Sequence, residues 1–286
     1  MKPILDTHAH FYQVTRPGGV AWPPKGSGAL DRDHLVADYE AAVKPLGFVG
    51  AVLVEASPLP EDTRWIQGLV AGNPFYPAFV AVLDVEAPDA AEKLAELADN
   101  PWVVGVRAFL WTGTITLDAR DRALLDKLSS LGMTLDLISR GDKNPKDDVE
   151  RLAKAFPELR VIINHLAGAR GGPPSAAWTA DMKRLGACPN VHMKLSAIFD
   201  MWNPGPDESV AWTSPLDVDS YRPQLDVVFD AFGPSRVVFG SNWPVTDMSG
   251  SIADEVRIVE SYLAPLGTTV RDAVMHDNAR RFYRRS

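Results

Sequence analysis

The chain repeats one pattern along its length: a short apolar run, a polar loop, and then a longer segment whose apolar residues recur every three to four positions. Short continuous apolar runs are typical of parallel strands that are covered on both faces. The pattern predicts eight strands, over Ile4–Asp6, Gly50–Glu55, Phe79–Leu83, Val103–Arg107, Thr134–Leu137, Arg160–Ile163, Val191–Leu195 and Val237–Phe239.

The segments between these runs carry helix signals. Residues 30–47 have apolar positions at helical spacing and end in a glycine. Residues 89–100 follow Pro88 and have acidic residues in the first turn, where they suit the positive end of the helix dipole. We expect further helices of this kind within residues 119–132, 145–158, 225–233, 252–267 and 270–285.

Strands that alternate with helices form a parallel sheet. Eight such units in 286 residues favour a single (β/α)8 TIM-type barrel, since that fold has about 250 residues, and we expect one domain over residues 1–286. An open doubly wound sheet is the alternative, but no G-x-G-x-x-G signature follows the first strand. Two loops rich in Pro, Gly and Trp, at 13–31 and 200–217, should cover the C-terminal face of the barrel.

The composition mainly excludes some classes of partner and location for the protein. The formal net charge of −8 argues against a nucleic-acid partner, which would require a basic surface. The one cysteine, Cys188, excludes an internal disulfide and indicates a reducing compartment. We find neither a secretory pattern at the N-terminus nor an apolar run of about 20 residues, the length of a membrane span. We therefore expect a cytoplasmic protein that acts on a small molecule; its oligomeric state, a homo-oligomer included, stays open.

Histidines follow two of the expected strands. His8 and His10, in "LDTHAHFY", are separated by one residue, so at the end of a strand both rings point to the same side, as does Asp6. His165 ends the apolar run in "LRVIINHLAG". Because the carboxyl ends of barrel strands meet at one face, the three imidazoles predict a shared site, which could bind Zn²⁺ or Mn²⁺. Ordinary polar or helix-capping histidines are the alternative.

Four charged residues near the ends of other strands each allow two interpretations. Arg107 could bind a substrate carboxylate through two parallel hydrogen bonds or form a structural ion pair. Lys194 could polarise a carbonyl, bind a carboxylate or belong to a buried ion pair. Glu55 and Asp136 could each act as a general base, or they could fill the barrel as polar groups with satisfied hydrogen bonds. The aromatic residues that could line a pocket or simply pack are Phe11, Tyr12, Trp22, Trp111, Trp202 and Trp243.

The order of the motifs "DTHAHF", "GVRAF", "NHLAG", "NVHMKLSA", "FGSNWPV" and "DNARRFY" resembles the amidohydrolase superfamily. It is most similar to the amidohydrolase 2 branch, which includes sugar-acid lactonases and the hydrolase of 2-pyrone-4,6-dicarboxylate. The resemblance covers nearly the whole chain and is strongest in the first and last motifs. It implies a (β/α)8 barrel in which His8 and His10 match the first-strand pair and His165 matches the later histidine.

Asn242 departs from this resemblance. The family has an aspartate here, in the pattern G-S-D-W-P, and that aspartate takes a proton from the attacking water and can bind the metal. Asparagine keeps the shape and one acceptor oxygen, but it cannot act as a general base and is a weaker metal ligand. Three explanations stay open: an engineered Asp→Asn variant, a natural variant whose base lies elsewhere, or a protein that has lost hydrolysis.

The resemblance implies a hydrolase that opens a lactone, or a similar cyclic ester, by adding water. The expected catalytic residues are His8, His10, His165 and Asn242, the first three also being the expected metal ligands. The expected substrate-binding residues are Arg107, Lys194, Glu55, Asp136 and Trp243. Zinc is the expected ion where one is bound, although some members of the branch are thought to work without one. The alternatives are a non-oxidative decarboxylase of a hydroxylated aromatic acid and a ligand-binding barrel without activity.

Overall fold

The computed structural model describes residues 2–56, 61–109, 116–138, 146–205 and 212–284. Within this part of the chain, eight strands form one sheet in chain order, and each strand is parallel to the next. The strands are β1 (Ile4–Ala9), β2 (Phe48–Val54), β3 (Ala78–Val82), β4 (Val103–Phe109), β5 (Thr134–Ile138), β6 (Val161–Ile163), β7 (Val191–Leu195) and β8 (Val237–Phe239).

The sheet curls into a nearly closed barrel. A parallel bridge between Ala9 and Trp243 joins the end of β1 to the segment that follows β8. The predicted fold is therefore confirmed, and the open doubly wound alternative is wrong. The main difference from the expected strands is at β1, which runs on to Ala9, so that His8 lies within the strand instead of after it.

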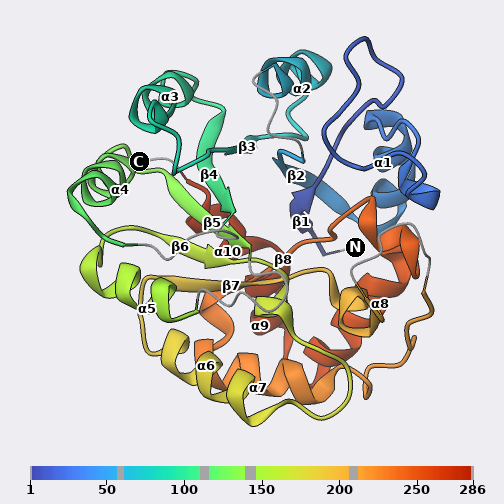
Figure 1. Ribbon diagram of the computed structural model, residues 1–286. Helices are drawn as coiled ribbons and strands as arrows, with labels where there is room; N and C mark the ends of the chain where they lie inside the picture. The colour runs from blue at the N-terminus through green and yellow to red at the C-terminus, as the bar shows by residue number, and fades with distance from the viewer. Residues whose placement is uncertain (1, 57–60, 110–115, 139–145, 206–211, 285–286) are drawn as a thin grey trace.

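Helices surround the sheet, as Figure 1 shows. They are α1 (Val36–Val43), α2 (Asp62–Val70), α3 (Ala90–Ala98), α4 (Ala119–Ser130), α5 (Lys146–Ala155), α6 (Ala176–Gly186), α7 (Arg222–Phe232) and α8 (Ile252–Leu263). Two short helices, α9 (Thr268–Asp272) and α10 (Asn278–Phe282), lie across one end of the barrel. The sequence analysis missed α2 and α6, and a π-turn over Ala273–Asp277 divides the last expected helix into α9 and α10. Among the described residues, no helix has the length and apolar character that crossing a bilayer requires.

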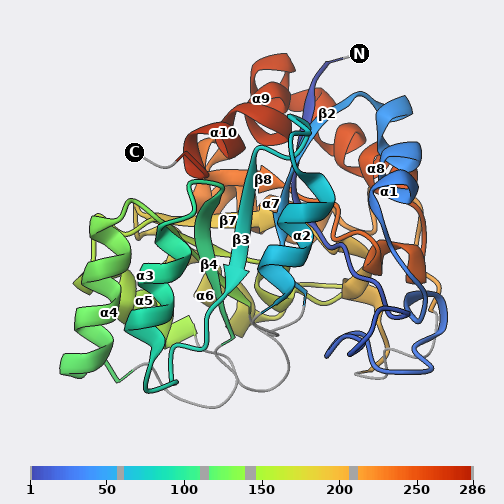
Figure 2. The same ribbon diagram turned by 90° about the horizontal axis from the view of Figure 1, so that it is seen from above.

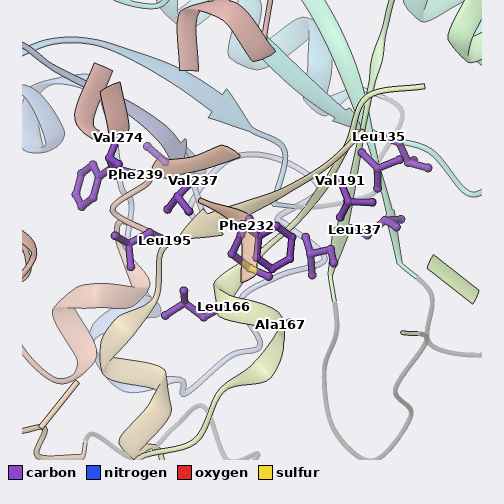
Figure 3. Close-up of a cluster of buried hydrophobic side chains, with 14 of the residues drawn as sticks. Leu135, Leu137, Leu166, Ala167, Val191, Leu195, Phe232, Val237, Phe239 and Val274 are labelled. Atoms are coloured by element: carbon purple, nitrogen blue, oxygen red, sulfur yellow. The ribbon is translucent and has the colours of Figure 1, made fainter. Parts of the chain in front are cut away.

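The apolar core has two parts, one on each face of the sheet. The outer part lies between the strands and the surrounding helices; Figure 3 shows a portion of it, with Leu135, Leu137, Leu166, Ala167, Val191, Leu195, Phe232, Val237, Phe239 and Val274 labelled. The inner part fills the barrel, where Val80, Ile162 and Val238 meet Phe282 and Tyr283.

The C-terminal helix thus closes one end of the barrel. In Figure 2, α9 and α10 lie at the end where the strands begin, and the arrowheads of β3 and β4 point to the opposite end. We call the opposite end, where the strands finish, the mouth.

The first of the two expected covering loops does reach the mouth. Trp22, from residues 13–31, lies with its ring centroid 5.8 Å from that of His10. In the second loop, Trp202 packs against Gly171, and residues 206–211 lie outside the described part of the chain. Trp111, an aromatic candidate from the sequence, also lies outside it.

Candidate active site

The structure brings the three histidines together at the mouth. The Nε2 atoms of His8 and His10 are 3.1 Å apart. The ring centroids of His8 and His165 are 4.5 Å apart, although the two residues come from β1 and from the turn after β6. The three rings form one cluster, in which His165 is half-buried and His8 and His10 are buried.

A buried carboxylate holds the ends of β1 and β8 together beneath this cluster. Asp6 accepts hydrogen bonds from the backbone N–H groups of His8 (2.9 Å) and Ser241 (2.8 Å), and from the hydroxyls of Ser241 (2.6 Å) and Tyr39 (2.6 Å). Gly240 is needed because an added Cβ would lie 2.8 Å from the Cβ of His8. The "FGS" part of the motif is therefore explained by close approach to β1.

The backbone is strained where three strands end. His165, Leu166 and Ala167 have φ angles of 56°, 49° and 52°, and Ala197 and Asn242 have φ angles of 53° and 55°. Left-handed conformations cost non-glycine residues about 1–2 kcal/mol each. Leu166 and Ala167 are fully buried in the cluster of Figure 3, and this packing holds the turn that presents His165.

Asn242 follows β8 at the mouth of the barrel. Its φ of 55° suits asparagine, which tolerates the left-handed region better than most residues. The carbonyl of the next residue, Trp243, accepts from the His10 N–H at 2.8 Å, so Asn242 is held beside the histidine pair. Within the described residues its side-chain amide makes no hydrogen bond. The amide is thus free to donate to, or accept from, a bound molecule.

Arg107 and Glu55 lie next to the histidines at the ends of β4 and β2. The Arg107 guanidinium donates to the carbonyl oxygen of Glu55 and adds positive charge near His8. The Glu55 carboxyl accepts from the Val82 N–H (2.6 Å) and the Thr63 hydroxyl (3.0 Å). Burial raises the pKa of Glu55 to about 8, so its proton stays bound at neutral pH. At neutral pH most of the Glu55 side chains are therefore protonated, and the role of replacement base stays a prediction.

Lys194 and Asp136 form a buried ion pair below the histidines. Lys194 Nζ donates to Asp136 Oδ2 at 2.7 Å, and both side chains are fully buried. Lys194 also donates to the carbonyl of Thr7 at 3.0 Å, and its Nζ lies 3.3 Å from His8 Nδ1. This arrangement matches the buried ion pair that the sequence left open for Lys194, and the pair lies beneath the mouth with its polar atoms engaged.

Trp243 packs among the aromatic residues next to the segment that follows β8. Its ring packs against Phe11, His34 and Tyr39 with centroid distances of 5.9, 5.2 and 5.3 Å, and only 2% of it is exposed. It therefore anchors the segment after β8, in line with the packing alternative that the sequence left open.

The donor set does not fit a tightly bound divalent ion. A metal-ligating histidine donates its second ring N–H to an acceptor. His10 meets this condition, since its Nδ1 lies 2.7 Å from the Val54 carbonyl oxygen, but His8 Nδ1 faces the Lys194 ammonium, a donor. Asn242 replaces a carboxylate, and no group of three His, Cys, Asp or Glu residues in the described ranges is arranged to hold a metal. The expected zinc site at His8, His10 and His165 is thus not supported by their hydrogen bonds.

Two residues near the site were not assigned a role from the sequence. Ser196, buried after β7, lies with its Oγ 2.9 Å from His165 Nδ1. Tyr283 follows α10, and its hydroxyl donates to Asp136 at 2.8 Å. Tyr283 could have been found from the sequence, because its hydroxyl is a polar group on a helix face that is otherwise apolar, with Ala279 and Phe282.

An eight-stranded parallel barrel with imidazoles, an arginine and an amide gathered where the strands end defines the class: this is a barrel hydrolase. The chain belongs to the amidohydrolase family, because the family model described as Amidohydrolase matches residues 5–285. The resemblance noted in the sequence is confirmed.

Relatives and solved structures agree with this membership. An L-fucono-1,5-lactonase from Burkholderia ambifaria is 32% identical over 294 residues, covering 98% of this chain and 95% of that protein. An L-fucono-1,5-lactonase from Burkholderia multivorans is 25% identical, with the same coverage of both chains. A crystal structure of an amidohydrolase from Burkholderia multivorans with bound zinc shares the fold, with a TM-score of 0.77, 24% identity and 98% of each chain covered.

Proposed function

We propose that this protein hydrolyses a lactone of a small anionic or polyhydroxylated acid. The observation that carries the proposal is the imidazole pair at the mouth, in which His8 and His10 meet at 3.1 Å. The pair lies beside Asn242, whose side-chain amide makes no hydrogen bond within the described part of the chain. The similarity to L-fucono-1,5-lactonases over nearly the whole chain supports the same class of substrate. Arg107, at the mouth, would hold the anionic or hydroxyl groups of that substrate.

His10 is the base in this proposal. The Val54 carbonyl can only accept, so His10 Nδ1 carries the proton of their 2.7 Å hydrogen bond and Nε2 keeps the lone pair. In the reaction, the attacking water replaces His8 as the donor to Nε2 and gives up its proton there. The same carbonyl then stabilises the imidazolium that forms. Asn242, which cannot take a proton, is not needed for this step.

Asn242 instead supplies a hydrogen-bond donor. Attack of water forms a C–O bond and turns the lactone carbonyl into a tetrahedral oxyanion, toward which the Asn242 Nδ2–H would point. Collapse of this intermediate breaks the ring C–O bond, and the leaving alkoxide takes the proton from His10. The product is a hydroxy acid. The amide at position 242 thus suits a site in which the base lies elsewhere.

The test is acid release from a panel of 1,4- and 1,5-lactones of sugar acids, followed with a pH indicator in weak buffer. His10→Asn keeps a donor for the Val54 carbonyl but removes Nε2, and we expect kcat to fall about 10²–10⁴-fold. His276→Asn, a histidine on the helical segment beyond α9, is the control and should leave kcat unchanged. The proposal fails if the wild type opens none of these lactones, or if His10→Asn retains full activity.

A substitution at position 242 distinguishes between two candidates for the general base, His10 and the residue at position 242 itself. Asn242→Asp should lower kcat about 10²-fold, because it removes the N–H donor and adds a negative charge where the oxyanion develops. A gain in activity would instead return the base to position 242. Release of CO₂ from a hydroxylated aromatic acid, without new acid from lactones, would support the decarboxylase alternative.

Metal dependence is measured on the same protein. The hydrogen bonds of His8 lead us to expect substoichiometric zinc in the purified protein by mass spectrometry, and activity that survives a chelator. One zinc per chain, with activity lost on chelation and restored by zinc, would overturn this expectation.

A further inference from the structure

A chain of polar side chains runs from the closed end of the barrel to the histidines. The Tyr283 hydroxyl donates to Asp136 Oδ2 at 2.8 Å, and Lys194 Nζ donates to the same oxygen at 2.7 Å. Tyr283, Asp136 and Lys194 are 5%, 0% and 0% exposed. The Lys194 ammonium also lies 5.4 Å from the centre of the Tyr283 ring. Because α10 lies at the end where the strands begin (Figure 2) and Tyr283, which follows it, packs in the inner apolar cluster, this series of side chains spans the barrel interior.

Lys194 has one acceptor for each of its three ammonium protons. These acceptors are Asp136 Oδ2, the Thr7 carbonyl at 3.0 Å and His8 Nδ1 at 3.3 Å. An ammonium cannot accept, so His8 Nδ1 must be the acceptor of the third hydrogen bond. The proton of a neutral His8 is then on Nε2.

The other end of this series of hydrogen bonds, at Val54, gives the same tautomer of His8 independently. The Val54 carbonyl fixes the proton of His10 on Nδ1, which leaves His10 Nε2 as an acceptor. His8 Nε2 lies 3.1 Å from that acceptor and must therefore donate to it. All five hydrogen bonds, from Tyr283 to Val54, run without a clash of two donors or two acceptors.

We propose that Tyr283 and Asp136 are positioning residues that hold the Lys194 ammonium against His8 and so fix His8 as the Nε2–H tautomer. His8 and His10 then present a donor and an acceptor side by side at the mouth. The catalytic consequence rests on the proposed function: His10 takes the proton of the attacking water, and His8 donates to the lactone carbonyl oxygen. The C-terminal segment is thereby part of the active site without touching the substrate.

Two tyrosines make a matched pair for the test. Tyr283→Phe removes the hydroxyl bonded to Asp136 and keeps the ring. Tyr262→Phe removes an equivalent hydroxyl, bonded to Asp226 at 2.9 Å, from a side chain that is 4% exposed and lies on α8, outside the barrel. We expect similar losses of stability in both variants, but a fall in kcat of about five- to tenfold, with KM changed less than twofold, in Tyr283→Phe alone.

The tautomer itself is read by long-range ¹H–¹⁵N correlation of histidine-labelled protein. We expect the His8 resonances of an Nε2–H imidazole in the wild type, and a shift toward the Nδ1–H form when Lys194→Met is combined with His10→Asn, because the double variant removes both groups that hold the Nε2–H form. An Nδ1–H His8 in the wild type would overturn the inference, as would equal kcat in Tyr283→Phe and Tyr262→Phe. If the wild type opens no lactone, the proposed function fails, while the spectrum still decides the tautomer.

Discussion

The hydrogen bonds to Asp6 make a quantitative prediction about how the barrel closes. Oδ1 accepts from two backbone N–H groups, of His8 and Ser241, whereas Oδ2 accepts from the hydroxyls of Ser241 and Tyr39. In Asp6→Asn the amide oxygen must stay with the backbone donors, because these cannot reverse. The amide nitrogen then faces two hydroxyls, which can turn to accept.

The magnitude follows from the two hydrogen bonds that change. Hydrogen bonds to a charged group contribute about 1.5–3 kcal/mol each, so losing two would cost about 3–6 kcal/mol. The hydroxyls recover part of this, and we expect Asp6→Asn to lower the free energy of unfolding by about 3 kcal/mol. Tyr39→Phe removes one donor and should cost about 1.5–2 kcal/mol.

Equilibrium unfolding in urea, followed by far-UV circular dichroism, measures both changes and the double variant. The double variant should be more stable than the sum of the single effects by about 1 kcal/mol, because both substitutions disturb the same hydrogen bond. A loss below about 1 kcal/mol in Asp6→Asn, or strict additivity, would show that Asp6 does not join β1 to the segment after β8 in the way described.

Two further predictions concern single positions. The pKa of Glu55 is raised to about 8 in the folded protein, so between its ordinary value of 4.5 and about 8 the folded state holds a proton that the unfolded state has lost. The stability of the wild type relative to Glu55→Gln should therefore fall by up to about 1.4 kcal/mol per pH unit across this window. Equal pH profiles of the two proteins in urea unfolding would contradict this prediction. Gly105→Ala should lower the free energy of unfolding by about 1–3 kcal/mol, because the new Cβ would overlap the Thr134 hydroxyl on the neighbouring strand. Gly68→Ala, with open space around it on α2, should raise the free energy of unfolding by about 0.5–1 kcal/mol. Similar unfolding midpoints for the two variants would refute this prediction.

The fold could be predicted because the strands of a covered parallel sheet are apolar on both faces. Val237–Phe239 and Val191–Leu195 were located with the correct bounds for this reason. The helix α6 was missed because a stretch rich in Gly and Pro precedes it, although Ser175 caps it through a hydrogen bond from the Trp178 N–H.

The site was predicted less completely, since a sequence shows which residues end a strand but not how deep each side chain lies. His8, His10 and His165 meet as their strand positions suggested. Lys194 lies on the same strand face as Ser196 but one layer deeper, where an ion pair engages it. The contact between Lys194 and His8 joins residues 186 positions apart, and no local pattern reports such a contact.

The placement of α10 across the closed end of the barrel has a consequence for how the protein is made. Translation proceeds from the N-terminus, so β1 and its histidines leave the ribosome long before Tyr283. Until then Ile162 and Val238 lack the apolar cap that completes their packing, and Asp136 lacks its phenol. Completion of the catalytic interior therefore waits for residues 278–284, and nascent barrels should stay chaperone-sensitive until that segment has emerged.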